Sequence, residues 1–218
     1  MWYDNLFIEV EALSDKQQAE KMAAYMQNKF VFLGIPKPKL RAVVKPYLKN
    51  ASKTSDIDWD FVKLCWNKEY REAQYIALEY LKHNKKKLVK SDLNRLKCLA
   101  VNRSWWETCD NLDALIGELV LKYPELKREM IIFSTSDNIW LRRIAIDYQQ
   151  KYKELTDTEQ LEKIICNNLN TNEFFIDKAI GWSLRDYSKT NLEWVRKFVN
   201  NHKDELAKLS IREASKNF

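Results

Sequence analysis

A small residue recurs in this chain at a nearly constant interval, each time within a segment that has the pattern of an amphipathic helix. The intervals are 36, 36, 34 and 35 residues, and the positions are Ala73, Cys109, Ala145, Ala179 and Ala214. A sustained period of this size is typical of stacked helix pairs, because one pair alone cannot bury its apolar face. We expect each small residue to lie where neighbouring helices approach most closely.

Partner helices are predicted between these segments, at roughly 58–67, 91–101, 125–135, 157–170 and 191–201. Asp157 and Asn191 are typical helix-initiating residues, and Pro124 suits the first turn of its helix. Upstream, the pattern predicts helices at roughly 4–12, 16–29 and 39–50, with a rigid connector at 34–38 and a loop at 50–56.

These elements predict one all-α domain, residues 1–218, built as a curved α-solenoid of helix pairs. A tetratricopeptide array has a similar period, but its characteristic Trp, Leu-Gly and Tyr positions do not recur in this chain. Composition agrees with an all-α fold, since 3 Gly and 4 Pro in 218 residues are too few for the turns of an all-β fold or for a glycine-rich phosphate loop.

The balance of charge favours a polyanionic partner. The chain has 37 Lys and Arg against 31 Asp and Glu, a formal charge of +6, although many proteins carry such an excess for solubility. It has no run of 18 apolar residues and no signal-peptide pattern, so we expect a cytoplasmic monomer with no membrane association. The cysteines and histidines lack zinc-ligand spacing, which predicts reduced, buried thiols and no structural metal; these are Cys65, Cys98, Cys109, Cys166, His83 and His202.

The segment 102–110 places two adjacent tryptophans and a carboxylate at the start of one predicted helix. Ser104 is the expected N-cap, with Glu107 completing a capping box. Trp106 and Asp110 are four residues apart and therefore share a helix face, an arrangement that can hold a cation. The spacing alone favours a plainer interpretation, with both tryptophans in the core and Asp110 as a solvated charge.

Cations recur in the segments that contain the small residues. If these segments line the concave side of the solenoid, that face is basic and interleaved with aromatic rings, as nucleic-acid binding requires. The alternative is that the cations are scattered over solvated helix faces. The residues concerned are Arg71, Arg142, Arg143, Lys178, Arg185 and Arg212.

Taken in order, several segments of the chain resemble the bacterial DNA alkylation repair glycosylases, which are built from HEAT-like repeats. The resemblance covers nearly the whole chain and rests on Met22–Ile35, Ser104–Asp110, Asn138–Ile146, Phe174–Tyr187 and Leu209–Ala214. It implies excision of positively charged N3- and N7-alkylated purines, such as 3-methyladenine and 7-methylguanine, from double-stranded DNA. It also implies that neither a metal nor a cofactor is needed.

The resemblance places the catalytic aspartate of the family at Asp110 and its two cleft tryptophans at Trp106 and Trp182. Its cleft arginine corresponds to Arg143 and its cleft tyrosine to Tyr25. The family can carry a polar residue where Pro36 stands here, so a DNA contact from that side chain is not carried over. Further DNA contacts are expected from Lys37, Lys39, Arg41, Lys178, Arg185 and Arg212.

The implied chemistry fits these residue types. The positive charge of an alkylated purine makes it a good leaving group, and its departure leaves an oxocarbenium-like sugar. Asp110 can stabilise that cation and orient or deprotonate the attacking water. The faces of Trp106 and Trp182 can hold the sugar, and Arg143 is expected to fix the flanking phosphates. Most glycosylases extrude the target base, whereas the resemblance implies that the lesion stays in the duplex.

Two other functions are compatible with the sequence. One is a catalytically silent relative that binds distorted or branched DNA; such relatives lose the aspartate or a tryptophan, which this chain keeps. The other is a protein–protein scaffold, the commonest use of helical repeats, which would need neither the Trp106–Asp110 arrangement nor a basic face.

Overall fold

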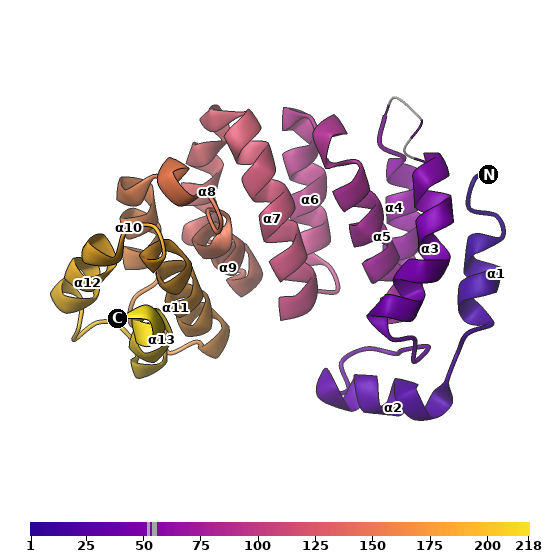
Figure 1. Ribbon diagram of the computed structural model, residues 1–218, viewed down its shortest axis with the longest axis horizontal. Helices are drawn as coiled ribbons and strands as arrows, with labels where there is room; N and C mark the ends of the chain where they lie inside the picture. The colour runs from indigo at the N-terminus through magenta and orange to yellow at the C-terminus, as the bar shows by residue number, and fades with distance from the viewer. Residues whose placement is uncertain (52, 54–55) are drawn as a thin grey trace. The chain divides into compact units, whose positions relative to one another are not determined.

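The computed structural model describes residues 1–51, 53 and 56–218, which fall into two compact units, Met1–Leu88 and Val89–Phe218. Regular structure in the described part is helical, and extended segments pair there only in an isolated bridge between Val31 and Tyr70. The prediction of an all-α fold is therefore confirmed (Figure 1). A single domain over 1–218, the curvature of the solenoid and a basic concave face stay predictions.

In its described residues, the first unit contains five α-helices and a short 3-10 turn: α1 (Leu6–Glu11), α2 (Lys16–Tyr25), α3 (Lys37–Ala51), α4 (Trp59–Asn67), α5 (Arg71–His83) and η1 (Lys85–Lys87). The α2 helix ends four residues before its predicted end, because Gln27 and Asn28 adopt left-handed backbone conformations that an α-helix cannot continue through. The α3 helix continues one residue beyond its predicted end, through Ala51, which was expected in a loop. The loop positions 52, 54 and 55 lie outside the described residues.

The predicted connector at 34–38 is held by a buried carboxylate. Glu72, at the start of α5, accepts hydrogen bonds from the backbone N–H groups of Leu33, Gly34 and Ile35, at 3.0, 2.9 and 3.1 Å. Gly34 has a φ of +88°, and a Cβ at this position would lie 2.1 Å from the carbonyl oxygen of Asp15. The close approach of the connector to α2 therefore requires glycine.

The second unit is a stack of α-helices with short 3-10 turns between them. Its elements are η2 (Lys90–Asp92), α6 (Leu93–Val101), α7 (Trp106–Lys122), η3 (Pro124–Leu126), α8 (Lys127–Ser134), α9 (Ile139–Asp147), η4 (Lys153–Leu155), α10 (Thr158–Cys166), α11 (Phe174–Ser188), α12 (Leu192–Asn201), α13 (Lys208–Ala214) and η5 (Ser215–Asn217). Asp157 and Asn191 cap α10 and α12 as predicted, and Pro124 opens its 3-10 turn.

The order of contacts in the second unit is the one that stacked helix pairs predict. Helix α9 packs between α7 and α11, and α11 packs in turn against α13. The partner helices α8 and α10 contact each other in a second layer, and α6 packs against α7 and α8 against α9 (Figure 1). The five periodic small residues are almost fully buried, at 0–1% exposure, as expected for positions of close packing.

Two expectations about small polar side chains are corrected. Cys65 and Cys109 are buried, but Cys98 and Cys166 are exposed, so only half of the cysteines are core residues. Ser104 is not an N-cap: its hydroxyl donates to the carbonyl of Ala100 at 2.6 Å, and α7 begins at Trp106.

Among the described residues, no helix combines the length and apolar character needed to cross a bilayer.

Candidate functional site

The N-terminal turns of α7 carry the carboxylate at the centre of the candidate site. Trp105 is in extended conformation before the helix, which places Trp106 at its first position and Asp110 one turn further on the same face. The Asp110 side chain is 24% exposed, and Trp106 is intermediate in exposure. The plainer interpretation of Asp110 as a fully solvated charge is therefore wrong.

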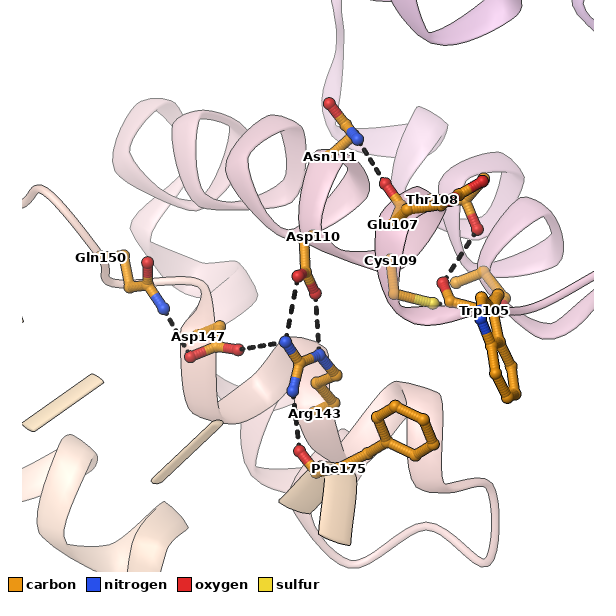
Figure 2. A network of polar contacts seen from close by, with 11 residues as sticks. Trp105, Glu107, Thr108, Cys109, Asp110, Asn111, Arg143, Asp147, Gln150 and Phe175 are labelled. Atoms are coloured by element: carbon orange, nitrogen blue, oxygen red, sulfur yellow. Dashed lines mark hydrogen bonds and ion pairs between the residues drawn. The ribbon is translucent and has the colours of Figure 1, made fainter. Parts of the chain in front are cut away.

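A buried arginine from the next helix of the layer holds Asp110. Arg143, on α9, donates from Nε to one carboxylate oxygen at 2.8 Å and from Nη2 to the other at 3.0 Å (Figure 2). Its Nη1 donates to the carbonyl of Phe175 at 2.7 Å, which ties the guanidinium to the start of α11. A two-pronged contact of this kind fixes the plane of the carboxylate as well as its position.

Arg143 does not lie on an open surface. Its side chain is only 2% exposed and its guanidinium binds Asp110 and the carbonyl of Phe175, so a phosphate contact from it stays a prediction. Arg71 also departs from the expectation of a cation on an open basic face, since it is fully buried with its guanidinium 3.8 Å from the centroid of Phe30. Two of the six cations in the repeated segments thus have roles inside the fold.

Helix α11 brings Trp182 to the same place. The Trp182 ring lies 5.4 Å from Cζ of Arg143 and 5.5 Å from Nζ of Lys178, within the range of cation–π attraction. Trp182 also lines a small pocket of about 80 Å³ together with Asp110, Asp113, Ala114, Asp147, Gln150 and Lys151. Its exposure is intermediate. The structure thus brings Asp110, Arg143 and Trp182 together from three successive helices of one layer.

Two further carboxylates, which the sequence did not single out, lie beneath Asp110. Asp113 is on α7 and Asp147 is at the end of α9, and oxygens of the three aspartates all lie within 4.8 Å of one another. Burial raises the pKa of Asp147 to about 7, against the opposing effect of Arg143. Burial and the charge of Asp147 also raise the pKa of Asp113 well above its usual range.

Three clustered carboxylates are a common setting for a divalent cation, and within the described residues this is the one such grouping of Asp, Glu, His and Cys. The positive charge among them is the Arg143 guanidinium, which contacts Asp110 and lies 3.9 Å from Asp147. Burial works to lower the pKa of Arg143, but Asp147 and Asp110 raise it, so the guanidinium stays charged. We therefore assign no metal to this cluster.

An aromatic cluster supports the site from below. Trp105 packs against Trp140 and Phe175, with ring centroids 5.6 and 5.2 Å apart. Trp105 and Trp140 are 7% and 8% exposed. Because Phe175 also supplies the carbonyl that binds Arg143, the packing of this cluster helps to fix the arginine. The core interpretation therefore holds for Trp105 but not for its neighbour Trp106.

Two of the expected cations of the second unit, Lys178 and Arg185, pair with one buried carboxylate. Glu213, on α13, pairs with Lys178 at 3.3 Å, Arg185 at 2.9 Å and Lys216 at 2.7 Å. Arg212 is exposed on the same helix. Lys178 and Arg185 are therefore held in place, with part of their charge compensated.

Four expected DNA-contact residues belong to the first unit, and each keeps an accessible side chain. Tyr25 is 71% exposed at the end of α2. Lys37 and Lys39 are exposed in the first turn of α3, with Nζ of Lys37 4.8 Å from the centroid of the Tyr75 ring. Arg41 pairs with Glu79 at 2.8 Å. The residues that resemble the cleft residues of the family thus lie in both units.

A larger pocket of about 370 Å³ lies near the end of α9, but it does not contain the features of the candidate site. It is lined by Gln149, Gln150, Lys151, Lys153, Glu154, Thr156, Leu161, Ser183, Asp186, Tyr187, Lys189 and Thr190. Asp110, Arg143 and Trp182 are not among these residues. We therefore place the site at the smaller pocket, where a held carboxylate meets an aromatic ring.

The fold and the site together define an all-α protein of stacked helix pairs, with a carboxylate held by a buried arginine beside an indole ring. Comparison with known proteins gives its family: residues 8–218 match the family described as DNA alkylation repair enzyme. A solved structure, described as a predicted DNA alkylation repair enzyme from Enterococcus faecalis, is similar to this chain. The two share 33% identity and a TM-score of 0.87 over 94% of this chain and 96% of the other. Curated proteins gave no match. The chain belongs to the DNA alkylation repair enzyme family.

Proposed function

We propose that the protein is a monofunctional DNA glycosylase that hydrolyses the N-glycosidic bond of N3- and N7-alkylated purines, such as 3-methyladenine and 7-methylguanine, in double-stranded DNA. The observation that carries the proposal is the Asp110–Arg143 pair, since a partly exposed carboxylate fixed in two directions suits the stabilisation of a cation. Membership of a DNA alkylation repair family supports the substrate class.

In this mechanism the alkylated base leaves with the bonding electrons, which cancels its positive charge. The sugar becomes oxocarbenium-like, and the carboxylate of Asp110 stabilises it. The indole faces of Trp106 and Trp182 add to this stabilisation. Water then adds to the sugar, and Asp110 orients it or accepts its proton. Arg143 positions Asp110 throughout, because it is already bound to both carboxylate oxygens.

Substitution of Asp110 by asparagine tests the reaction. The change keeps the shape of the side chain and removes its charge, so we expect the single-turnover rate of 7-methylguanine release from a duplex oligonucleotide to fall at least ~100-fold. Asp137→Asn is the matched control, because Asp137 is an exposed carboxylate of the same unit, and its rate should equal that of the wild type. Circular dichroism verifies that both variants are folded. A wild-type rate for Asp110→Asn would contradict the proposal. If the wild-type protein bound DNA but released no base, the catalytically silent alternative would be favoured.

Double-stranded DNA is the proposed partner, bound by a monomer of the protein. Each phosphate contact made by a cation contributes about −0.9 to the slope of log affinity against log salt concentration. We expect Arg212→Ala to reduce the magnitude of that slope by about 0.9, the value for one contact, because Arg212 is an exposed cation of the layer that carries the site. Lys163→Ala, an exposed cation of α10 in the other layer, should leave it unchanged. A flat salt response in the wild type would favour the scaffold alternative.

A further inference from the structure

Arg143 lies between two carboxylates of very different exposure. Asp110 is 24% exposed, whereas the side chain of Asp147, one turn after Arg143 on α9, is fully buried. Figure 2 shows that one guanidinium nitrogen, Nη2, faces both Asp110 and Asp147. The Arg143 guanidinium is therefore shared by a carboxylate that reaches solvent and one that does not.

The two carboxylates are not bound equally. Asp110 accepts two hydrogen bonds from Arg143, but the nearest oxygen of Asp147 is 3.9 Å from Nη2, beyond hydrogen-bond distance. The other oxygen of Asp147 accepts a hydrogen bond from Gln150 at 2.6 Å. Among the described residues, the oxygen that faces Arg143 has no hydrogen-bond partner. A buried carboxylate in this state can hold either a charge or a proton.

The charge of Asp147 changes the net charge of the group. With Asp147 protonated, Asp110 and Arg143 cancel each other. With Asp147 ionised, the three groups carry a net charge of −1. Because the surroundings are buried, this difference acts at Asp110 with little screening. A site that must stabilise a cation gains from the second state.

We propose that Asp147 is a positioning residue for Asp110: it attracts the same Nη2 group of Arg143 that donates to Asp110, and its ionisation leaves the charge of Asp110 available to the substrate. This inference rests on the proposed function, since it concerns the stabilisation of a cationic sugar. Asp147 does not touch the reacting atoms; it acts through Arg143.

The groups that face Asp147 define what else can influence it. Asp110 and Asp113 face it from α7, Arg143 from its own helix, Gln150 and Lys151 from the following segment, and Asp186 from α11. Residues of α6, α8 and α10 do not line this pocket in the described part of the chain. The raised pKa of Asp147, about 7 as a result of burial, places its ionisation in the range where activity is measured.

The test is the pH dependence of base release. Single-turnover rates for a duplex containing 7-methylguanine are measured between pH 5.5 and 8 for the wild type, Asp147→Asn and the control Asp137→Asn. We expect the wild-type and control rates to rise roughly tenfold across the neutral range as Asp147 ionises. Asp147→Asn, which cannot ionise, should give a flat profile at the low-pH level of the wild type. A rise that persists in Asp147→Asn, or a flat profile in the wild type, overturns the inference.

A second measurement separates failure of this inference from failure of the proposed function. In protein labelled with ¹³C in its aspartate carboxyl groups, the Asp110 resonance should show a step near neutral pH as Asp147 ionises, and Asp147→Asn should remove that step. A wild type that releases no base at any pH contradicts the proposed function, and the NMR titration then decides the role of Asp147 alone. If Asp147→Asn does not fold, the wild-type titration decides: absence of the step overturns the inference.

Discussion

Trp105 and Trp106 are adjacent in the chain, yet they differ in environment. Trp105 precedes α7 in extended conformation and packs into the cluster with Trp140 and Phe175. Trp106 is the first residue of the helix and keeps intermediate exposure on the face that carries Asp110. The change from extended to helical backbone between them is what directs one ring into the core and leaves the other accessible.

Alanine substitutions of this pair should therefore separate stability from activity. Trp105→Ala should lower the free energy of unfolding by about 3–5 kcal/mol, because it leaves a large cavity in a packed cluster. Trp106→Ala should lower it by less than ~1 kcal/mol but slow base release roughly tenfold, through loss of an aromatic face at the cation. Urea unfolding and single-turnover rates measure the two effects. Equal losses of stability in the two variants would show that Trp106 is also a core residue.

The shared face of Trp106 and Asp110 could be predicted from sequence, because a spacing of four residues is enough to define it. The pairing of Asp110 with Arg143 could not, since these residues are 33 positions apart and meet only through the packing of α7 on α9. The proximity of Arg143 and Asp147 could be predicted from their spacing of four residues on one helix. The burial of that pair, which raises the pKa of Asp147, could not be predicted from sequence.

At the scale of elements, the period of small residues predicted the stacking of the second unit because it reports where helices must approach. Helix boundaries were less predictable. Serine is a residue type typical of N-caps, but the hydroxyl of Ser104 binds a carbonyl in the last turn of α6, and α7 begins two residues later. A serine between two helices can serve either one, and the sequence does not state which.

Gly181 is a further point of close approach, between α11 and α13. A Cβ at this position would lie 2.5 Å from Cβ of Glu213 and 3.0 Å from the carbonyl oxygen of Ser210. Replacement of a mid-helix glycine by alanine normally stabilises a helix by about 1 kcal/mol. Here we expect the opposite sign, a loss of roughly 1–3 kcal/mol, because α13 must move away.

Thermal unfolding of Gly181→Ala measures this effect, and Lys208→Ala is the control, since it adds no contact at an exposed position of α13. The free energy of unfolding of the control should be within about 0.5 kcal/mol of the wild-type value. Displacement of α13 should also disturb Glu213, which holds Lys178 and Arg185 near the site. An unchanged or raised midpoint for Gly181→Ala would mean that α11 and α13 are packed loosely enough to accept a methyl group between them.

At the scale of the whole molecule, the buried aspartates link stability to pH. The pKa values of Asp113 and Asp147 are raised above their usual range by burial, so the folded protein binds protons that the unfolded chain releases. Their contribution to stability is complete below the pKa of an unfolded aspartate, about 4, and is lost as the pH rises through their folded pKa values. For Asp147 that loss proceeds between about pH 4 and pH 7 and is complete above its folded pKa of about 7.

Carboxylates whose pKa is lowered act in a different range. The hydrogen bond from Lys127 lowers the pKa of Asp157, so its contribution to stability is lost only as the pH falls below its usual range. Between pH 5 and 8 the buried aspartates should therefore dominate the carboxylate part of the pH dependence.

We accordingly expect the midpoint of thermal unfolding to fall as the pH is raised from 5 to 8. Over this interval, the fall in Asp147→Asn should be about 5 °C smaller than the fall in the wild type. The exposed variant Asp137→Asn should follow the wild type. If Asp147→Asn lost as much stability over this interval as the wild type, Asp147 would not be the group that titrates. Ionisation of Asp147 would thus weaken the fold while making the charge of Asp110 available, so the pH that favours base release should be the pH at which the protein is less stable. A buried carboxylate that served only the fold would give no reason for these two profiles to oppose each other.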